Sequence, residues 1–396
     1  MITADSVSVA SEGRTRKYRA LFAYAVLAIV AGLMLFSRVK DTRAGGAAYQ
    51  TADWLINYGD GFVRRGLFGQ LFLSVTPQGD AGGLWILFGV QSLLYLVIFV
   101  FAGWILHRYN YSWSMIALVC GPAAVGFFGW DPGSGFRKEV LAYVALAALV
   151  WALVPGGRPR RAVTVSLVSL LVFVVAVFSW ETSALFAPAF LYLLLRRTDD
   201  LRMFRRWLAA TFLVVAGAGL ALGTVFHGTT ETATAICDTV RAHGYTGAEI
   251  CSGAIDAIGW TSSFTLASVA ESFPLYAGYI PLIILGLVPV VATRWVRENW
   301  RWAVFIAIAF VPLFVIVTDY GRWTNMIVMA LLFCIVAGKR EDSFSPVWNP
   351  LATVLYVSLW GLPHWLPADD DQSWPWLGLV KTLNSSAIDL FGKILG

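Results

Sequence analysis

Two short segments of the chain combine acidic, basic and small residues at a spacing that suits acid–base and phosphate chemistry. The first, residues 58–69, holds four glycines around Asp60, Arg64 and Arg65, and glycines allow sharp turns and a close approach of the backbone. An ionised carboxylate such as Asp60 can take the proton of an acceptor hydroxyl, and two guanidinium groups match the bidentate geometry of phosphate oxygens. The alternative is an Asp60–Arg64 ion pair that only stiffens the loop, but such a pair would not need a second arginine.

The second segment, residues 131–139, runs from Asp131 through a Pro-Gly-Ser-Gly turn to Arg137, Lys138 and Glu139. The turn ends one apolar stretch and the next begins near 137, so both cations fall in the first turn of an expected helix, where the helix dipole disfavours positive charge. Cations at that place are expected where they bind an anion, and the free backbone amides of the helix N-terminus would hold the same anion. Glu139 has a simpler structural role, because acids suit helix N-termini.

Further charged residues lie beside apolar stretches. Glu181, in the turn 179–183, could form a hydrogen-bonded corner or bind sugar hydroxyls, a cation or a proton. Asp319 and Arg322 have the three-residue spacing of a helical ion pair, and both that role and a substrate site stay open. The candidate substrate-binding residues are therefore Asp131, Glu139, Glu181, Asp319 and Arg322. No Walker A, GxSxG, HExxH or GxGxxG pattern is present, and no spacing is typical of a metal site.

The elements that must position these residues are membrane helices. Of the 396 residues, 58% are hydrophobic and only 13% are charged, whereas a soluble domain carries about 25% charged residues. The apolar residues run in long blocks, and blocks of about 18 or more are typical of transmembrane helices. The fold class expected is therefore an all-α polytopic membrane protein with about 11 spans, roughly 21–37, 82–106, 112–130, 137–154, 162–180, 183–195, 207–226, 275–293, 302–318, 323–338 and 347–363.

Charge sets the orientation of these spans. Every dense basic cluster between spans falls on one side, which the positive-inside rule makes cytoplasmic; these clusters lie at 107–108, 158–161, 196–206, 294–301 and 339–340. The N-terminus is then inside, and eleven spans put the C-terminus outside. The net charge of +5 lies largely in these short loops, so it indicates orientation rather than binding to nucleic acid.

The chain therefore divides into a disordered cytoplasmic tail at 1–20, a transmembrane domain at 21–363 and an outer C-terminal segment at 364–396. All the charged candidates named above then lie at the outer ends of spans. Ionisable residues at that level are costly unless they are paired or hydrated, so they are functional candidates by default. Interfacial salt bridges without a function are the alternative.

Two outer loops, 38–81 and 227–274, are long. The first contains Asp53 and two moderately apolar stretches, around 48–58 and 66–75, which suit helices lying in the membrane interface. The second contains Cys237 and Cys251. These two cysteines share one exported loop in an oxidising compartment and are expected to form a disulfide.

In this architecture the chain resembles bacterial polytopic glycosyltransferases of the GT-C type and, more loosely, O-antigen and other polysaccharide polymerases. The shared features are a cytoplasmic N-terminus and a long first outer loop with interfacial helices, the acids Asp53 and Asp60, and arginines after them. The resemblance implies that a first-loop carboxylate is the base, Asp60 or else Asp53, and that the donor is a polyprenyl-phosphate sugar. The chain departs from the family because it has no adjacent acidic pair in that loop and no large C-terminal soluble domain.

The function predicted is an inverting glycosyltransferase of the bacterial plasma membrane, active at the extracytoplasmic face in cell-envelope polysaccharide assembly. A first-loop acid would activate a hydroxyl of a glycan or lipid acceptor. The leaving lipid phosphate would be held by four cations, Arg64, Arg65, Arg137 and Lys138. No cofactor is evident, although a donor with a pyrophosphate could recruit a divalent cation.

Two other classes of membrane protein are the alternatives to a glycosyltransferase. A transporter or a lipid or polysaccharide flippase would place polar residues near the bilayer midplane on broken helices, often in two related halves. The expected spans are apolar at their centres, and no half-repeat is visible. A membrane acyltransferase usually needs a reactive histidine, and the outer histidines here lack acidic neighbours at helical spacing.

Overall fold

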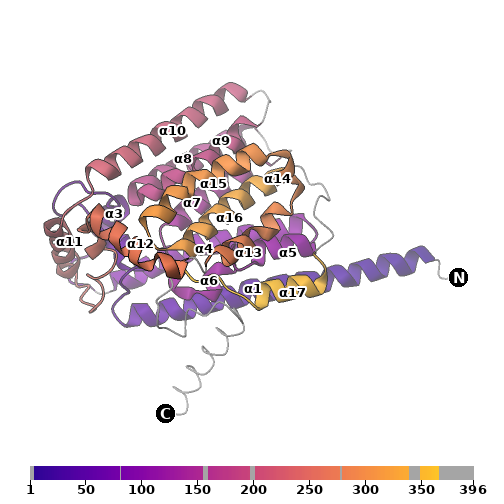
Figure 1. The fold of residues 1–396 in the computed structure, drawn as a ribbon, viewed down its shortest axis with the longest axis horizontal. Coiled ribbons are helices and arrows are strands. Elements are labelled where there is room, and N and C mark those ends of the chain that lie inside the picture. The colour runs from indigo at the N-terminus through magenta and orange to yellow at the C-terminus, as the bar shows by residue number, and fades with distance from the viewer. Residues whose placement is uncertain are drawn as a thin grey trace, which may run out of the picture.

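The computed structural model describes residues 4–80, 82–154, 159–196, 201–276, 279–338 and 348–364. These residues form an all-α protein of seventeen α-helices and three 3₁₀ helices (Figure 1). Most of the longer helices lie side by side in one bundle, with α1 and α10 at opposite edges (Figure 1). Apart from His364, the expected outer C-terminal segment lies outside the described residues.

Four helices are long and apolar enough to cross a membrane, and they are α1 (Ala4–Arg43), α4 (Gly83–Arg108), α8 (Pro159–Ser179) and α10 (Arg202–Val225). Only 33% of the apolar window of each is buried within the protein. The remaining apolar surface faces outward, and contiguous apolar surface of this extent is typical of contact with lipid. The fold is therefore that of a multi-pass membrane protein.

Shorter apolar helices fill the centre of the bundle. They are α7 (Glu139–Ala152), η2 (Glu181–Phe186) with its continuation α9 (Ala187–Leu195), α13 (Tyr279–Val291), α15 (Trp300–Ile316) and α16 (Tyr320–Val336). Every residue of α16 is buried, and α16 packs against α7, α9, α13 and α15. A helix that is apolar on all sides is expected at such a central position.

The expected span 112–130 is interrupted and forms two helices, α5 (Trp113–Cys120) and α6 (Phe127–Trp130). Pro122 lies in the interruption and has no backbone N–H to donate. The carbonyls of Ala123 and Ala124 accept hydrogen bonds from Asn325 Nδ2 in α16, at 3.0 and 2.9 Å. Irregular backbone inside a membrane bundle is tolerated where protein groups satisfy it in this way.

The two ends of the chain depart from expectation. Helix α1 begins at Ala4, so residues 4–20, expected to be disordered, continue the first helix; this stretch is rich in alanine, arginine and other residues that helices accommodate well. The expected last span, 347–363, holds only the short α17 (Pro350–Ser358). The expected span 275–293 corresponds to α13, and α12 (Ser262–Tyr276) precedes it within the expected outer loop.

Residues 38–81, which we call the first outer loop after their expected position, contain α2 (Ala52–Leu55) and α3 (Leu67–Val75), where the two apolar stretches lie. The expectation that both lie in the membrane interface is wrong for α2, because all four of its residues are buried in the protein. Trp54 packs edge to face on Phe68, with ring centroids 4.7 Å apart, and donates from Nε1 to the Phe136 carbonyl at 2.7 Å. Helix α2 is thus an internal element that carries Asp53 into the protein.

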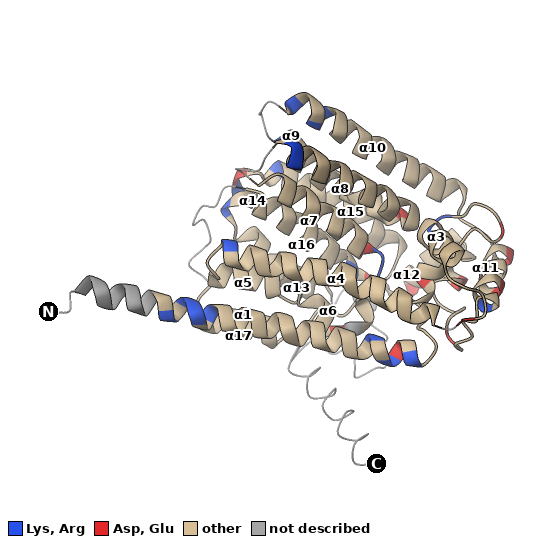
Figure 2. Cartoon of the chain, turned by 180° about the vertical axis from the view of Figure 1, so that it is seen from behind, with Lys and Arg blue, Asp and Glu red and all other residues tan. Residues whose placement is uncertain are grey.

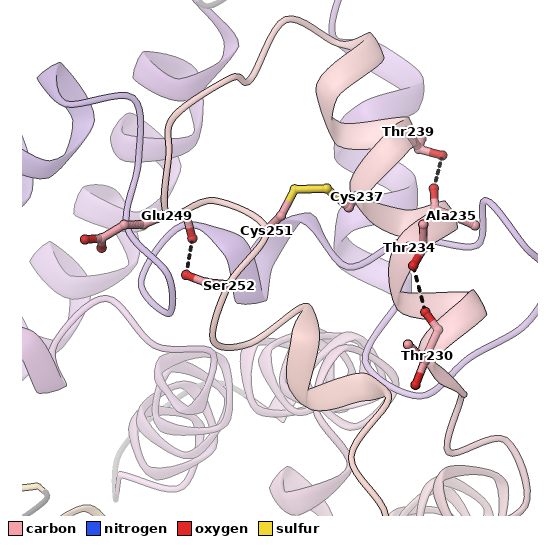
Figure 3. The surroundings of a disulfide bond; sticks show 8 residues. All are labelled: Thr230, Thr234, Ala235, Cys237, Thr239, Glu249, Cys251 and Ser252. Carbon is pink, nitrogen blue, oxygen red and sulfur yellow. Dashed lines mark hydrogen bonds between the residues drawn. A yellow bond between two sulfur atoms is a disulfide. The ribbon is translucent and has the colours of Figure 1, made fainter.

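The second outer loop contains α11 (Thr230–Ala242), η3 (Asp256–Ile258) and α12. Cys237 in α11 and Cys251 are joined by the predicted disulfide (Figure 3). The remaining short elements are η1 (Pro132–Ser134) and α14 (Arg294–Glu298). Many lysines and arginines lie at the end of the bundle where α10 begins and α14 lies, whereas most acidic residues lie at the other end, near α3, α11 and α12, together with some basic residues such as those at the end of α1 (Figure 2).

Candidate functional site

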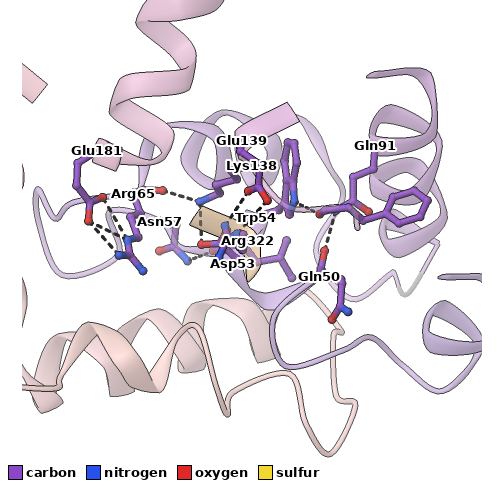
Figure 4. A network of polar contacts seen from close by, with 12 residues as sticks. Gln50, Asp53, Trp54, Asn57, Arg65, Gln91, Lys138, Glu139, Glu181 and Arg322 are labelled. Atoms are coloured by element: carbon purple, nitrogen blue, oxygen red, sulfur yellow. Dashed lines mark hydrogen bonds and ion pairs between the residues drawn. The ribbon is translucent and has the colours of Figure 1, made fainter. Parts of the chain in front are cut away.

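Nine charged side chains from four separate stretches of the chain meet where α2, η2 and the beginnings of α7 and α16 come together. We call this set the charge cluster, and it consists of Asp53, Arg64, Arg65, Arg137, Lys138, Glu139, Glu181, Asp319 and Arg322. Figure 4 shows six of them, namely Asp53, Arg65, Lys138, Glu139, Glu181 and Arg322. All nine were candidates on sequence grounds, and only the fold brings them together.

One part of the charge cluster joins the first outer loop to η2. Arg65 donates from Nε to both carboxylate oxygens of Glu181, at 3.1 and 3.2 Å, and from Nη2 to Oε1 at 3.0 Å. Arg64 Nη1 lies 3.8 Å from the same Oε1. Burial and the neighbouring Arg65 lower the pKa of Arg64 to about 10, although Glu181 opposes the shift. The Glu181 carboxylate therefore balances the positive charge of two neighbouring arginines.

Lys138 connects this part to α2. Its Nζ donates to the backbone carbonyl of Arg65 at 2.9 Å and lies 3.6 Å from Asp53 Oδ1. Both side chains are buried, and a buried ammonium group needs a nearby negative charge. Asp53 Oδ1 receives no hydrogen bond in the described structure. The carboxylate therefore keeps one oxygen that can accept a proton or a further donor.

A second part of the charge cluster centres on Arg322, at the beginning of α16. Arg322 forms a two-pronged ion pair with Glu139, from Nε to Oε1 at 2.9 Å and from Nη2 to Oε2 at 2.7 Å. Its Nη1 reaches Asp319 Oδ2 at 3.2 Å, and its guanidinium lies 4.5 Å from the centre of the Trp180 ring. The expected Asp319–Arg322 pair is present, but Glu139 is the closer partner.

Arg137 is a buried cation without a close ion pair among the described residues, although Asp319, Glu139 and Asp53 act on its charge from further away. Its side chain forms no ion pair within the described part of the chain, its Nε has no hydrogen bond, and only 5% of the residue is exposed. The guanidinium lies 4.7 Å from the centre of the Tyr49 ring. Within the charge cluster, five cations thus face four carboxylates. A buried cation without a counter-charge is costly, so this arrangement is suited to binding an anion.

Asp131 and His364 form a separate pair close to Arg137. Asp131 Oδ2 accepts from the His364 backbone N–H at 2.9 Å and contacts its Nδ1. Burial favours a higher pKa for Asp131, but the His364 charge and hydrogen bonds outweigh it and hold the pKa below its usual range. Burial likewise disfavours the His364 cation, but Asp131 raises its pKa above the usual value. Asp131, a predicted substrate ligand, is therefore already engaged by the segment after α17.

A supporting layer of hydrogen bonds was missed on sequence grounds. Arg38, in α1, donates from Nη1 to Thr51 Oγ1 at 2.7 Å and from Nε to Gln91 Oε1 at 3.1 Å. Gln91 Nε2 donates in turn to the carbonyls of Gln50 and Phe136, at 2.7 and 3.2 Å (Figure 4). A signal existed, because Arg38 follows an apolar stretch and Gln91 lies inside one, where polar groups need partners. This layer fixes the loop before α7 against the first outer loop.

The backbone is left-handed at two points of the site, Arg65 with φ of 69° and Phe136 with φ of 58°. Such a conformation costs a residue other than glycine on the order of 1–3 kcal/mol and persists where its surroundings determine it. Here it presents the Arg65 carbonyl to Lys138 and the Phe136 carbonyl to Trp54 and Gln91. The strain therefore coincides with the contacts that assemble the charge cluster.

Asp60 lies outside the charge cluster. Its side chain is exposed, and its Oδ2 lies 3.4 Å from Thr232 Oγ1 at the beginning of α11. The ion pair considered between Asp60 and Arg64 is not formed, because Glu181 is the acidic partner of Arg64. Gly61 adopts a φ of 94° that allows the turn around Asp60. Of the two first-loop acids, Asp53 is the one at the charge cluster.

Comparison with known protein families, with curated proteins and with solved structures finds no match for this chain. The chemistry of the site therefore has to carry the functional argument. Among the described residues, no three His, Cys, Asp or Glu side chains come together in a way that could hold a metal ion. What the cluster offers is one more cation than carboxylate groups, together with a carboxylate oxygen, Asp53 Oδ1, that accepts no hydrogen bond in the described structure. These features suit binding an oxyanion and taking up a proton.

Proposed function

We propose that this protein is an inverting membrane glycosyltransferase of the GT-C kind, which transfers a sugar from a polyprenyl-phosphate donor to a glycan or glycolipid acceptor. The observation that carries the proposal is Arg137, a buried cation of the charge cluster that forms no close ion pair among the described residues. A phosphate supplies the missing negative charge, and phosphate oxygens are preferred partners of arginine. A phosphate on a polyprenyl chain reaches such a site from the bilayer.

The proposal includes eleven spans, a cytoplasmic N-terminus and an extracytoplasmic C-terminus in a bacterial plasma membrane. The separation of basic and acidic residues along the bundle supports this orientation (Figure 2), and the Cys237–Cys251 disulfide suits an oxidising compartment. Cysteine-accessibility labelling at positions 200 and 370 should report opposite sides of the membrane. Labelling of both from one side would contradict the proposed topology.

The donor phosphate is proposed to bind at Arg137, with Arg64, Arg65 and Lys138 around it. Arg65 and Lys138 are already held by Glu181 and by the Arg65 carbonyl, so they contribute charge from fixed positions. Charges fixed in a buried site stabilise developing negative charge more strongly than they would in water, because they need not reorganise during the reaction. Their role is to stabilise the lipid phosphate as it leaves.

Asp53 is the proposed general base. Asp60 ranks first on sequence grounds, but Asp53 lies in the charge cluster and its Oδ1, beside Lys138 Nζ at 3.6 Å, accepts no hydrogen bond in the described structure, which supports Asp53 instead. Oδ1 takes the proton of the acceptor hydroxyl while the hydroxyl oxygen bonds to the anomeric carbon. The bond between that carbon and the phosphate oxygen breaks, and its electron pair leaves with the lipid phosphate.

The remaining candidates have structural roles in this proposal, with one exception. Glu139 and Arg322 neutralise each other in the buried interior, and Asp131 is held by His364. Asp319 has a side chain that is 24% exposed, and a second carboxylate oxygen can accept from a sugar hydroxyl. We therefore assign Asp319 to sugar binding.

One observation favours a transporter as the second candidate. The interruption between α5 and α6 is the kind of broken helix at which transporters bind their substrates. However, the carbonyls of Ala123 and Ala124 in this interruption already accept from Asn325. The excess charge lies in the charge cluster instead, which supports the transferase.

The test is a binding measurement on the full-length protein in lipid nanodiscs, with a polyprenyl monophosphate and the matching polyprenol as probes. The wild type should prefer the phosphate by about ten-fold or more, since a charge-assisted hydrogen bond contributes about 1.5–3 kcal/mol. Arg137→Gln should lose most of this preference. The matched control is Arg241→Gln on the exposed face of α11, which should bind like the wild type.

Two outcomes would contradict the proposal. The first is equal binding of the polyprenyl monophosphate and the polyprenol by the wild type. The second is an Arg137→Gln variant that retains the full preference for phosphate. Transport of the phosphate across the membrane without transfer of a sugar would favour the second candidate.

A further inference from the structure

A cavity separate from the charge cluster lies between the first outer loop and α11. Its volume is about 460 Å³, within the range of about 300–1,000 Å³ that is common for small-molecule sites. Residues 57–59, the outward face of α3 with the turn after it, and α11 line it. The Cys237–Cys251 disulfide anchors α11, the helix that forms one of these walls (Figure 3).

The lining of this cavity is polar but contains no Asp, Glu, Lys or Arg. It consists mainly of amide and hydroxyl side chains, with one leucine as the only aliphatic side chain. Its histidine, His243, has both ring nitrogens against backbone carbonyls, Nδ1 at 2.9 Å from Thr239 O and Nε2 at 3.2 Å from Leu73 O. The ring of His243 is therefore engaged by the protein itself, and the cavity has no acidic, lysine or arginine side chain for an ionic ligand and little apolar surface for a lipid chain.

The serine and threonine hydroxyl groups in the lining already donate their protons to backbone carbonyls. Ser74 Oγ donates to Leu71 O at 2.8 Å, and Thr239 Oγ1 donates to Ala235 O at 2.9 Å. Each hydroxyl oxygen keeps lone pairs, because a hydroxyl carries one donor and two acceptor sites. These oxygens are therefore acceptors for the hydroxyl protons of a ligand.

Donors in the lining come from the amides. Gln70 Oε1 accepts from the backbone N–H of Tyr58 at 3.1 Å, which orients the amide and leaves its two N–H donors without a partner in the described structure. The side chain of Gln78 forms no hydrogen bond within the described residues. A ligand that both donates and accepts at many positions would satisfy these groups and the hydroxyl oxygens together.

From this lining we infer a binding site for a neutral, polyhydroxylated ligand, namely an uncharged oligosaccharide. Every sugar hydroxyl is at once a donor and an acceptor, so it matches the alternation of amide N–H groups and hydroxyl oxygens. Tyr58 also lines the cavity, and its hydroxyl is a further group that can donate to and accept from a sugar.

The position of the cavity gives the oligosaccharide a role that rests on the proposed function. Asn57 and Tyr58, in its wall, directly follow α2, which carries Asp53, and the same loop continues to Arg64 and Arg65. The proposed role is to hold the acceptor glycan on the same loop that joins Asp53 to Arg64 and Arg65. The binding of the oligosaccharide itself does not depend on that role.

The test measures binding of short neutral oligosaccharides, built from hexoses or pentoses, to the full-length protein in nanodiscs. Ser74 lies on the exposed face of α3, so Ser74→Trp fills the cavity without disturbing the core. Ser252→Trp is a matched control, because Ser252 is also exposed and also donates to the carbonyl three residues earlier, Glu249 O at 2.7 Å. Ser74→Trp should weaken binding by about ten-fold or more, the effect of losing one or two hydrogen bonds, and Ser252→Trp should leave it unchanged.

Absence of binding by every neutral oligosaccharide in the panel would overturn the inference, as would equal binding by Ser74→Trp and the wild type. Polyprenyl monophosphate binding is measured on the same variants and should not change in Ser74→Trp. If the oligosaccharide binds at Ser74 but the wild type shows no preference for the lipid phosphate, the oligosaccharide site stands and the proposed glycosyl transfer fails.

Discussion

Arg65 and Glu181 stand 116 positions apart in the chain, yet three hydrogen bonds of 3.0–3.2 Å join their side chains. This ion pair connects the first outer loop to η2 and leaves Arg64 close enough to share the same carboxylate. Removing the carboxylate charge would leave two neighbouring arginines repelling each other in a poorly solvated place.

Glu181→Gln should therefore destabilise the protein substantially. Breaking one side of a buried ion pair costs about 3–5 kcal/mol, and the partial exposure of this pair favours the lower end, about 3 kcal/mol. Thermal unfolding in a mild detergent measures the effect. Glu298→Gln is the control, since the Arg294–Glu298 pair is 53% exposed on both sides and such pairs contribute about 0–1 kcal/mol. If both variants lose the same amount of stability, the Glu181 pair contributes no more than an exposed ion pair.

Arg137→Gln should have the opposite effect on the empty protein. An unpaired buried cation is a cost to the folded state, so replacing it with a neutral side chain should leave the melting temperature unchanged or raise it. In the wild type, added polyprenyl monophosphate at about 100 times its Kd should stabilise the folded state by about 2.7 kcal/mol. This ligand-dependent gain should vanish in Arg137→Gln. A marked destabilisation of the variant without ligand would instead indicate that Arg137 has a purely structural role.

Asp53→Asn and Asp60→Asn distinguish the two first-loop acids. If Asp53 is the base, Asp53→Asn should slow sugar transfer by about 10²–10⁴-fold, the usual effect of losing a positioned general base, while polyprenyl monophosphate still binds. Asp60→Asn should leave the rate of sugar transfer nearly unchanged, because Asp60 lies outside the charge cluster and surface substitutions usually have small effects. Transfer assays with purified protein and a polyprenyl-phosphate sugar decide between them. The reverse result would return the base to Asp60.

The Asp131–His364 pair predicts a dependence on pH. Because Asp131 raises the pKa of His364 in the folded protein, the pair contributes its full stability below the ordinary histidine pKa of about 6.5. That contribution is lost as the pH rises through the raised pKa of His364. The difference in melting temperature between the wild type and His364→Gln should therefore be largest near pH 6 and shrink toward pH 9, values that lie about the ordinary pKa and above it. A difference that stays constant over this window would rule out a charged pair.

The disulfide predicts a link between redox state and the oligosaccharide site. Replacing Cys237 and Cys251 together with serine opens a bond between residues 14 positions apart, and a loop of this size is stabilised by about 3 kcal/mol in the chain-entropy description. Helix α11, which forms one wall of the cavity, should then be held less firmly. Oligosaccharide binding should therefore weaken, while binding of polyprenyl monophosphate should not. Nanodisc titrations of both probes provide the measurement, with a Cys120→Ser variant as the control for a buried free cysteine.

The sequence predicts the all-α fold and its long apolar helices, because long apolar blocks are local features. It also points to the nine residues of the charge cluster, because charges at the ends of such blocks are local features too. It could not give the pairing inside the cluster. The three-residue spacing of Asp319 and Arg322 was visible, but the stronger partner of Arg322, Glu139, comes from another helix. Asp60 ranks above Asp53 in the sequence because glycines flank it. Asp53 is at the charge cluster because α2 is buried and held by Trp54, and such tertiary packing is not visible in the sequence.

The doubly held Arg65 has a consequence for movement. Its guanidinium is fastened to η2 through Glu181, and its main-chain carbonyl is fastened to the start of α7 through Lys138. The loop between α2 and α3 therefore cannot swing outward unless both anchors release at once. It acts as a fixed wall of the site and not as a gate, so any opening that admits a substrate has to occur elsewhere around its rim.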